Sequence, residues 1–215
     1  MRPFQHLFFD LDGTLTDPAQ GITAACTYAL KKLGYPLLSY EELCTFIGPP
    51  LKGCFESHCG MSPEQADRAV ETYREYYRDR GLFENQEIPG VRQALAGLRE
   101  RGYRLCVATS KPEVFAVRIL EKFELASFFE VIAGSDLAGA RVEKAAVIED
   151  LIARTGADRT RTLMIGDTKY DILGARQAGI AGAGVAFGYG TRAELREAGA
   201  LWIAETPEEI LKNLE

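Results

Sequence analysis

Short apolar runs alternate with amphipathic stretches along most of this chain, and from residue 91 onward the alternation is regular. The apolar runs have the length of buried strands, whereas the stretches between them carry apolar residues at helical spacing. The runs expected to form strands are residues 7–9, 103–109, 131–133, 162–165 and 183–186. Strands that alternate with helices in this way form a parallel sheet covered by helices. The pattern therefore predicts an α/β fold.

Residues 18–88 interrupt this alternation, because their pattern is helical throughout. Helical spacing recurs in four stretches, residues 22–33, 40–47, 51–59 and 63–80. We interpret this helical block, inserted after the first strand, as a cap on the α/β core. We therefore expect two domains, a core of residues 1–16 and 89–215 and a helical cap of residues 17–88.

Charge and composition exclude several classes of partner. The 31 Asp and Glu residues outnumber the 25 Lys and Arg residues, and the net charge of −6 argues against nucleic acid or anionic lipid as a main partner. No apolar run approaches the roughly 18 residues of a membrane span. The five cysteines include no CxxC pair and no export signal is present, which indicates reduced thiols. We therefore expect a cytoplasmic protein with no membrane partner.

Acidic residues follow two of the predicted strands, at the edge of a parallel sheet where ligands bind. Asp10 and Asp12 come directly after the first apolar run, and two carboxylates at this spacing repel each other unless a cation lies between them. Asp167 and Asp171 follow the run at residues 162–165, and Asp171 is also placed to cap the next helix. Four carboxylates at one edge suit a hard cation such as Mg²⁺.

Hydroxyl groups and a lysine follow two further predicted strands. Thr109 ends the run at residues 103–109 and Ser110 follows it, at a predicted turn from strand to helix. Hydroxyls and N–H groups at such a turn bind phosphate well. Lys144 lies near a predicted helix start, where a lysine opposes the helix dipole and so does not serve helix stability. Carboxylates with a metal, facing hydroxyls and a lysine, can transfer phosphoryl groups through a carboxylate nucleophile.

Four of these segments occur in an order that resembles a known family. Residues 10–14 (DLDGT), Thr109, Lys144 and residues 166–171 (GDTKYD) resemble the four motifs of the haloacid dehalogenase superfamily. The helical insert is similar to the C1 cap of the branch that includes phosphoglycolate phosphatases and 5'-nucleotidases. The resemblance implies a Rossmann-like core sheet, with its first strand beside the second and the fourth.

The resemblance also implies a role for each matched residue. Asp10 would be the nucleophile, and Asp12 would be the general acid to the leaving oxygen and then the base to water. Thr109 and Lys144 would bind the transferring phosphate. Many members carry the motif lysine in a Lys-Pro pair, which this chain lacks, so Arg141 is an alternative to Lys144.

Metal and substrate ligands are implied in the same way. The expected Mg²⁺ ligands are Asp10, Asp12 through its backbone carbonyl, Asp167 and Asp171, the last directly or through water. The expected substrate-binding residues are Gly13, Thr14, Ser110 and, from the cap, Lys52.

We therefore predict a Mg²⁺-dependent phosphomonoester hydrolase that acts on a small cytosolic phosphometabolite through an aspartyl-phosphate. Phosphoglycolate and nucleoside monophosphates are the favoured substrates. A sugar phosphomutase of the β-phosphoglucomutase type and a protein-tyrosine phosphatase remain alternatives on the same core. The expected partner is a small-molecule phosphate ester, and the expected assembly is a monomer or a homodimer.

Overall fold

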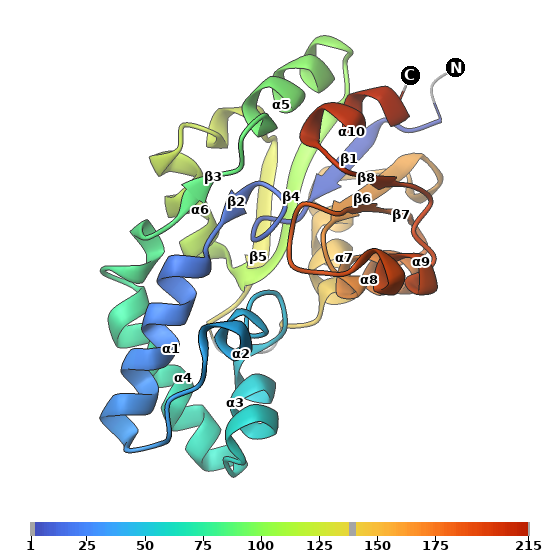
Figure 1. Cartoon of the computed structure of the whole chain (residues 1–215). Coiled ribbons are helices and arrows are strands. Elements are labelled where there is room, and N and C mark those ends of the chain that lie inside the picture. Colours follow the sequence, from blue (N-terminus) through green and yellow to red (C-terminus); the bar gives the residue numbers. More distant parts are fainter. Residues whose placement is uncertain (1–2, 138–140, 215) are drawn as a thin grey trace. The chain divides into compact units, whose positions relative to one another are not determined.

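The computed structural model describes residues 3–137 and 141–214 and divides the chain into two compact units. The first unit is Met1–Asp17 with Glu87–Glu215, and the second is Pro18–Gln86. Figure 1 shows the strands in the first unit and a group of helices in the second. That the second unit acts as a cap remains a prediction.

The first unit contains a six-stranded parallel sheet, which confirms the predicted fold class. Its strands in spatial order are β5 (Val131–Ser135), β4 (Arg104–Pro112), β1 (His6–Phe9), β6 (Thr162–Gly166), β7 (Ala181–Val185) and β8 (Ile203–Ala204). Strand β1 pairs with β4 on one side and β6 on the other, so Phe9 lies opposite both Val107 and Ile165. The carboxyl end of β1 therefore lies level with Val107 of β4 and Ile165 of β6.

Strand β4 runs further than the sequence pattern predicts. The apolar run was expected to form a strand over residues 103–109, but β4 continues to Pro112 and helix α6 begins at Glu113. The reason is an irregularity in the pairing with β5, where Ala108 lies opposite Ala133 and Pro112 opposite Ser135. Thr109 and Ser110 were expected at a turn between strand and helix and lie instead in an irregular strand end.

Helices cover the sheet in the first unit (Figure 1). They are α5 (Val91–Glu100), α6 (Glu113–Lys122), α7 (Lys144–Thr155), α8 (Lys169–Gln177), α9 (Arg192–Ala198) and α10 (Pro207–Asn213). Val147, Ile148 and Leu151 of α7 form a buried cluster with Phe8 of β1 and Met164 of β6. This packing brings the start of α7 to the central strands, which matters for Lys144.

The second unit consists of helices α1 (Ala19–Leu33), α2 (Tyr40–Cys44), α3 (Leu51–Cys59) and α4 (Pro63–Tyr77). Helices α2 and α4 begin with capping boxes at Ser39 and Ser62, in which side chain and backbone satisfy each other's hydrogen bonds. Short strands β2 (Thr16–Asp17) and β3 (Gln86–Glu87) form a separate two-stranded sheet. In the residues described, no helix is both long enough and apolar enough to span a membrane.

Helix α1 contacts the turn Gly81–Phe83 so closely that only glycine fits at position 21. A Cβ added to Gly21 would lie 1.9 Å from the carbonyl oxygen of Gly81. We expect Gly21→Ala to lower the free energy of unfolding by about 1–3 kcal/mol, because backbone must move on both sides. Gly53→Ala in α3 is the matched control, since no atom lies within 4 Å of its added Cβ. It should be neutral or stabilising by about 0.5 kcal/mol, as urea unfolding would show. Equal effects of the two substitutions would contradict the predicted clash.

Candidate active site

Asp10 lies at the carboxyl end of the central strand of the sheet. Its N–H donates to the carbonyl of Ile165 at 2.9 Å, which continues the pairing of β1 with β6 by one residue. The residue is 5% exposed, so the carboxylate is buried at the edge where β4, β1 and β6 end. A carboxylate in this position is costly unless cations lie near it.

Three buried carboxylates gather here. Side-chain oxygens of Asp10, Asp167 and Asp171 all lie within 4.8 Å of one another. Asp171 caps helix α8, because its Oδ2 accepts hydrogen bonds from the N–H of Thr168 at 3.0 Å and the hydroxyl of Thr168 at 2.9 Å. Its Oδ1 is left to face the other carboxylates and Lys144. Asp171 therefore both caps the helix and belongs to the acidic cluster.

Lys144 is the cation of this cluster. Its Nζ lies 2.8 Å from Asp10 Oδ1 and 2.7 Å from Asp171 Oδ1, and donates to the carbonyl of Ala108 at 3.0 Å. Burial alone would lower the pKa of Lys144, but Asp10 and Asp171 raise it above its ordinary value. The ammonium is therefore charged and linked to both carboxylates.

Arg141, the alternative to Lys144, contacts other residues. Its guanidinium lies 3.0 Å from Asp150 and 3.7 Å from Glu113, and donates to the carbonyl of Gly134. Of the two candidates, Lys144 is the residue whose side chain contacts Asp10.

Asp167 is fully buried and held by main chain and side chains from two loops. The N–H of Tyr189 donates to Asp167 Oδ2 at 2.8 Å, and the hydroxyl of Thr14 lies 3.5 Å from Oδ1. A Cβ added to Gly13 would lie 2.1 Å from Asp167 Oδ2, so this position accepts only glycine. Gly13 and Thr14, predicted to bind substrate, thus pack against a carboxylate of the cluster. The sequence pattern gave no sign that Tyr189 contacts this site.

The cluster lacks positive charge. Burial raises the pKa of Asp10 from 3.8 to about 6, although Lys144 lowers it. Burial, with the neighbouring Asp171 and Asp10, raises the pKa of Asp167 well above its usual range. Three carboxylates face one lysine here, so the cluster favours either bound protons or a bound cation.

Asp12 lies outside this cluster and pairs with a second buried lysine. Its Oδ2 is 2.7 Å from Nζ of Lys111, and both side chains are nearly inaccessible to solvent. The hydroxyl oxygen of Thr109 accepts the N–H of Lys111 at 3.2 Å, which links the phosphate-binding candidate to the same strand end. No role was predicted for Lys111. No sequence signal marked it, because its position depends on the irregular pairing of β4 with β5 between Ala108 and Pro112.

Two further predicted residues lie apart from these groups. Ser110 is half-buried in the irregular end of β4. Lys52 lies in the helical unit, where its Nζ is 2.8 Å from Asp67. A role for either residue in binding substrate remains a prediction.

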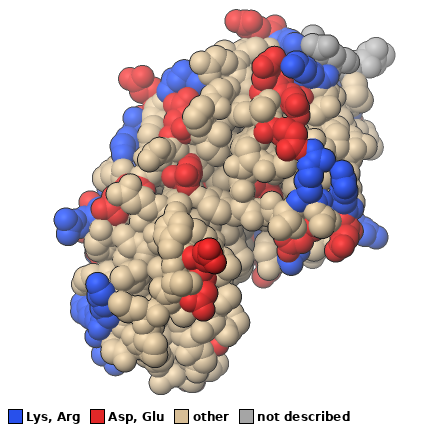
Figure 2. Space-filling view, in the orientation of Figure 1, with Lys and Arg blue, Asp and Glu red and all other residues tan. Residues whose placement is uncertain are grey.

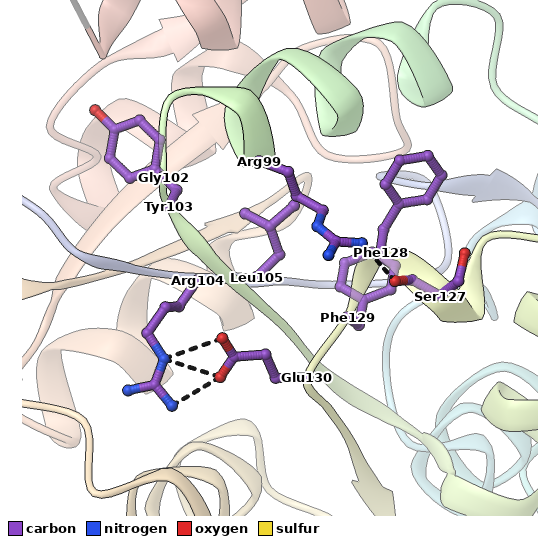
Figure 3. A pocket seen from close by; sticks show the side chains of 9 residues that line it. All are labelled: Arg99, Gly102, Tyr103, Arg104, Leu105, Ser127, Phe128, Phe129 and Glu130. Atoms are coloured by element: carbon purple, nitrogen blue, oxygen red, sulfur yellow. Dashed lines mark hydrogen bonds and ion pairs between the residues drawn. The ribbon is translucent and has the colours of Figure 1, made fainter.

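A cavity of about 300 Å³ lies at the opposite end of β4 (Figure 3). Arg99 donates to the carbonyl of Ser127 at 2.7 Å, and Arg104 pairs with Glu130. These charged side chains have partners within the cavity wall, and none of the predicted site residues lines it. The acidic edge at the carboxyl ends of the strands is therefore the candidate active site.

Known proteins resemble this chain in sequence and in fold. The family model described as "Haloacid dehalogenase-like hydrolase" matches residues 7–185. A 5'-nucleotidase of Pseudomonas aeruginosa is 44% identical over 90% of this chain and 87% of its own length. A phosphoglycolate phosphatase of Caulobacter vibrioides is 33% identical over 84% of this chain and 78% of its own. A crystal structure described as a predicted phosphatase from Clostridium acetobutylicum superposes with a TM-score of 0.94 at 39% identity, covering 98% of this chain and 97% of that one.

Loss of Lys144 should weaken the fold itself. Lys144→Met removes the cation from two buried carboxylates, so in EDTA we expect the free energy of unfolding to fall by about 3–5 kcal/mol. Lys52→Met is the control, because its pair with Asp67 is exposed and should be worth less than about 1 kcal/mol. Urea unfolding of both variants at neutral pH measures the difference. If Lys144→Met lowered the free energy of unfolding no more than Lys52→Met does, the contacts of Lys144 with Asp10 and Asp171 would not stabilise the fold as proposed.

Proposed function

The chain belongs to the haloacid dehalogenase-like hydrolases, and from this membership we propose that it is a Mg²⁺-dependent phosphomonoester hydrolase that works through an aspartyl-phosphate. The predicted family and the predicted phosphatase class are both confirmed by the relatives. The single observation that carries the proposed mechanism is the position of Asp10. It is a buried carboxylate at the end of the central strand, with Lys144 and two more carboxylates around it.

The residues present fit a magnesium ion. Asp10, Asp167 and Asp171 offer oxygen ligands only, which is the donor set that Mg²⁺ prefers. The crowding of three buried carboxylates, which raises the pKa values of two of them, supports the binding of added positive charge. The side chain of Asp12 pairs with Lys111, so the proposed contribution of Asp12 to the metal is its backbone carbonyl. When bound, the ion would let an anionic carboxylate approach an anionic phosphate.

The chain's own groups supply the covalent chemistry. A carboxylate oxygen of Asp10 attacks phosphorus, and the bond from phosphorus to the leaving oxygen breaks while Asp12 gives that oxygen a proton. Asp12 then takes a proton from the water that attacks the aspartyl-phosphate, which releases phosphate and restores Asp10. Lys144 and the hydroxyl of Thr109 hold the oxygens of the transferring group. The Thr109 oxygen accepts the Lys111 N–H, so its own proton is free to donate to phosphate.

The proposed substrate is a small phosphate ester, such as phosphoglycolate or a nucleoside 5'-phosphate. The names of the two relatives support these classes. Figure 2 shows acidic and basic side chains interspersed on the face drawn, without one basic patch that would suit nucleic acid. A cytoplasmic location and a monomeric or homodimeric state remain predictions.

The nucleophile is tested by Asp10→Asn. We expect phosphate release to fall by about 10³-fold or more, because an amide oxygen cannot form the acyl phosphate. Asp79→Asn is the control, since Asp79 is exposed in the helical unit. Intact-mass spectrometry of the native enzyme, quenched in acid during turnover, should show one added phosphoryl group that Asp10→Asn lacks. Substantial residual turnover would remove Asp10 as nucleophile, and phosphosugar interconversion without phosphate release would indicate a mutase.

The stabilisation of the fold by Mg²⁺ should depend on pH. Because the pKa of Asp10 is raised from 3.8 to about 6, the folded metal-free protein holds a proton that the unfolded chain releases. Its free energy of unfolding therefore falls as pH rises through this window. Mg²⁺ replaces protons on its ligands. The rise in melting temperature caused by Mg²⁺ over EDTA should thus be small near about pH 5 and several degrees near about pH 8. An equal Mg²⁺ effect at both pH values would contradict the proposed ligand set.

A further inference from the structure

Lys111 and Asp12 form a buried pair that leaves one carboxylate oxygen bare. The lysine Nζ lies 2.7 Å from Asp12 Oδ2, and the two side chains are 5% and 11% exposed. Asp12 Oδ1 is buried and has no hydrogen-bond partner among the residues that the structure describes. A buried acceptor without a partner is costly, and such an atom in a native structure points to a ligand or a catalytic role. One oxygen is therefore held while the other is available.

The backbone of β4 is shaped to bring Lys111 to this position. Between Ala108 and Pro112, β4 advances four residues while β5 advances two, from Ala133 to Ser135. Such an irregularity re-aims a side chain, and it is frequent beside active sites. The hydroxyl oxygen of Thr109 holds the bulge by accepting the N–H of Lys111.

The neighbouring strand makes room for this irregularity. A Cβ added to Gly134 of β5 would lie 2.5 Å from the carbonyl oxygen of Lys111. Only glycine lets β5 approach the bulge this closely. The position of Lys111 is therefore specified from two strands.

A buried lysine is an expensive way to stabilise a fold. Removing an ammonium from water costs several kcal/mol, and pairing with one carboxylate often does no more than offset that cost. The exposed pair of Lys212 and Glu208 on α10, at 3.0 Å, has no such cost. What a buried pair supplies instead is a single fixed geometry for both partners.

We infer that Lys111 is a positioning residue for Asp12: it holds Oδ2 so that the bare Oδ1 faces the leaving oxygen of the substrate. The inference rests on the proposed function, in which Asp12 is the general acid. Lys111 itself transfers no proton. Misplacing a catalytic group by about 1 Å can cost about 100-fold in rate, so a fixed carboxylate has value only in steps that use the acid.

The test compares substrates that differ in their need for an acid. The alkoxide leaving group of glycerol 1-phosphate requires a proton, whereas p-nitrophenolate leaves without one. For Lys111→Met we expect kcat/KM to fall by about 10-fold or more with glycerol 1-phosphate and by less than about threefold with p-nitrophenyl phosphate. The ratio kcat/KM reports the steps up to departure of the leaving group, so slower hydrolysis of the aspartyl-phosphate does not disturb the comparison.

Three further variants make the result decisive. Lys111→Arg keeps the charge and should recover part of the lost activity with the alkyl ester. Gly134→Ala displaces the bulge while keeping both Lys111 and Asp12, so it should show the same preference for the aryl ester and serves if Lys111→Met fails to fold. Lys212 is exposed on α10, so Lys212→Met should leave kcat/KM unchanged with both glycerol 1-phosphate and p-nitrophenyl phosphate.

The outcomes separate this inference from the proposed function. An equal loss with both esters for Lys111→Met would overturn it, because Lys111 would then act on phosphate or on the fold. The absence of any loss would overturn it as well. Asp12→Asn is the reference: if it shows the leaving-group dependence and the Lys111 and Gly134 variants do not, only the inference fails. If Asp12→Asn shows no such dependence, the assignment of Asp12 as general acid fails first.

Discussion

The ammonium of Lys144 lies between two buried carboxylates, and the arrangement of the whole acidic edge depends on it. Lys144 is the first residue of helix α7, whose apolar face packs on the central strands. The packing of that helix therefore sets where the charge lies. The same ammonium contacts Asp10 at the end of β1 and Asp171 in the first turn of α8. One cation thus ties together three elements that are far apart along the chain.

A second buried lysine, Lys111, pairs with Asp12. Lys144 contacts two carboxylates and Lys111 contacts one, and the two groups of charges differ in what remains unsatisfied. Around Lys144 the excess is charge, since three carboxylates share one cation, and a divalent ion would neutralise it. Around Lys111 the excess is a single bare oxygen, which a substrate atom can fill. The first imbalance suits a metal and the second suits an acid that meets a leaving group.

Much of this arrangement could be predicted because parallel strands place their carboxyl ends at one edge. Asp10 and Asp167 follow neighbouring strands, so their proximity required only the strand assignments. Lys111 could not be found in this way, because its position depends on a bulge that arises when β4 pairs with β5. The same bulge extends β4 to Pro112, so helix α6 begins only at Glu113. Thr14 and Gly13 match the family motif, but their contact with Asp167 depends on how two distant loops pack. The residues that select a substrate lie beyond what local pattern can indicate.

The central place of β1 has a consequence for how the protein is made. β1 is the first strand of the sheet to leave the ribosome, yet its two partners are β4 and β6. The second of these is complete only at Gly166. Both edges of the apolar segment Leu7-Phe8-Phe9 therefore lack partners until β4 is complete, and the edge that pairs with β6 lacks one until Gly166 is synthesised. Until β6 is complete, the strand that leads into Asp10 thus presents an open, apolar edge that can pair wrongly with other chains.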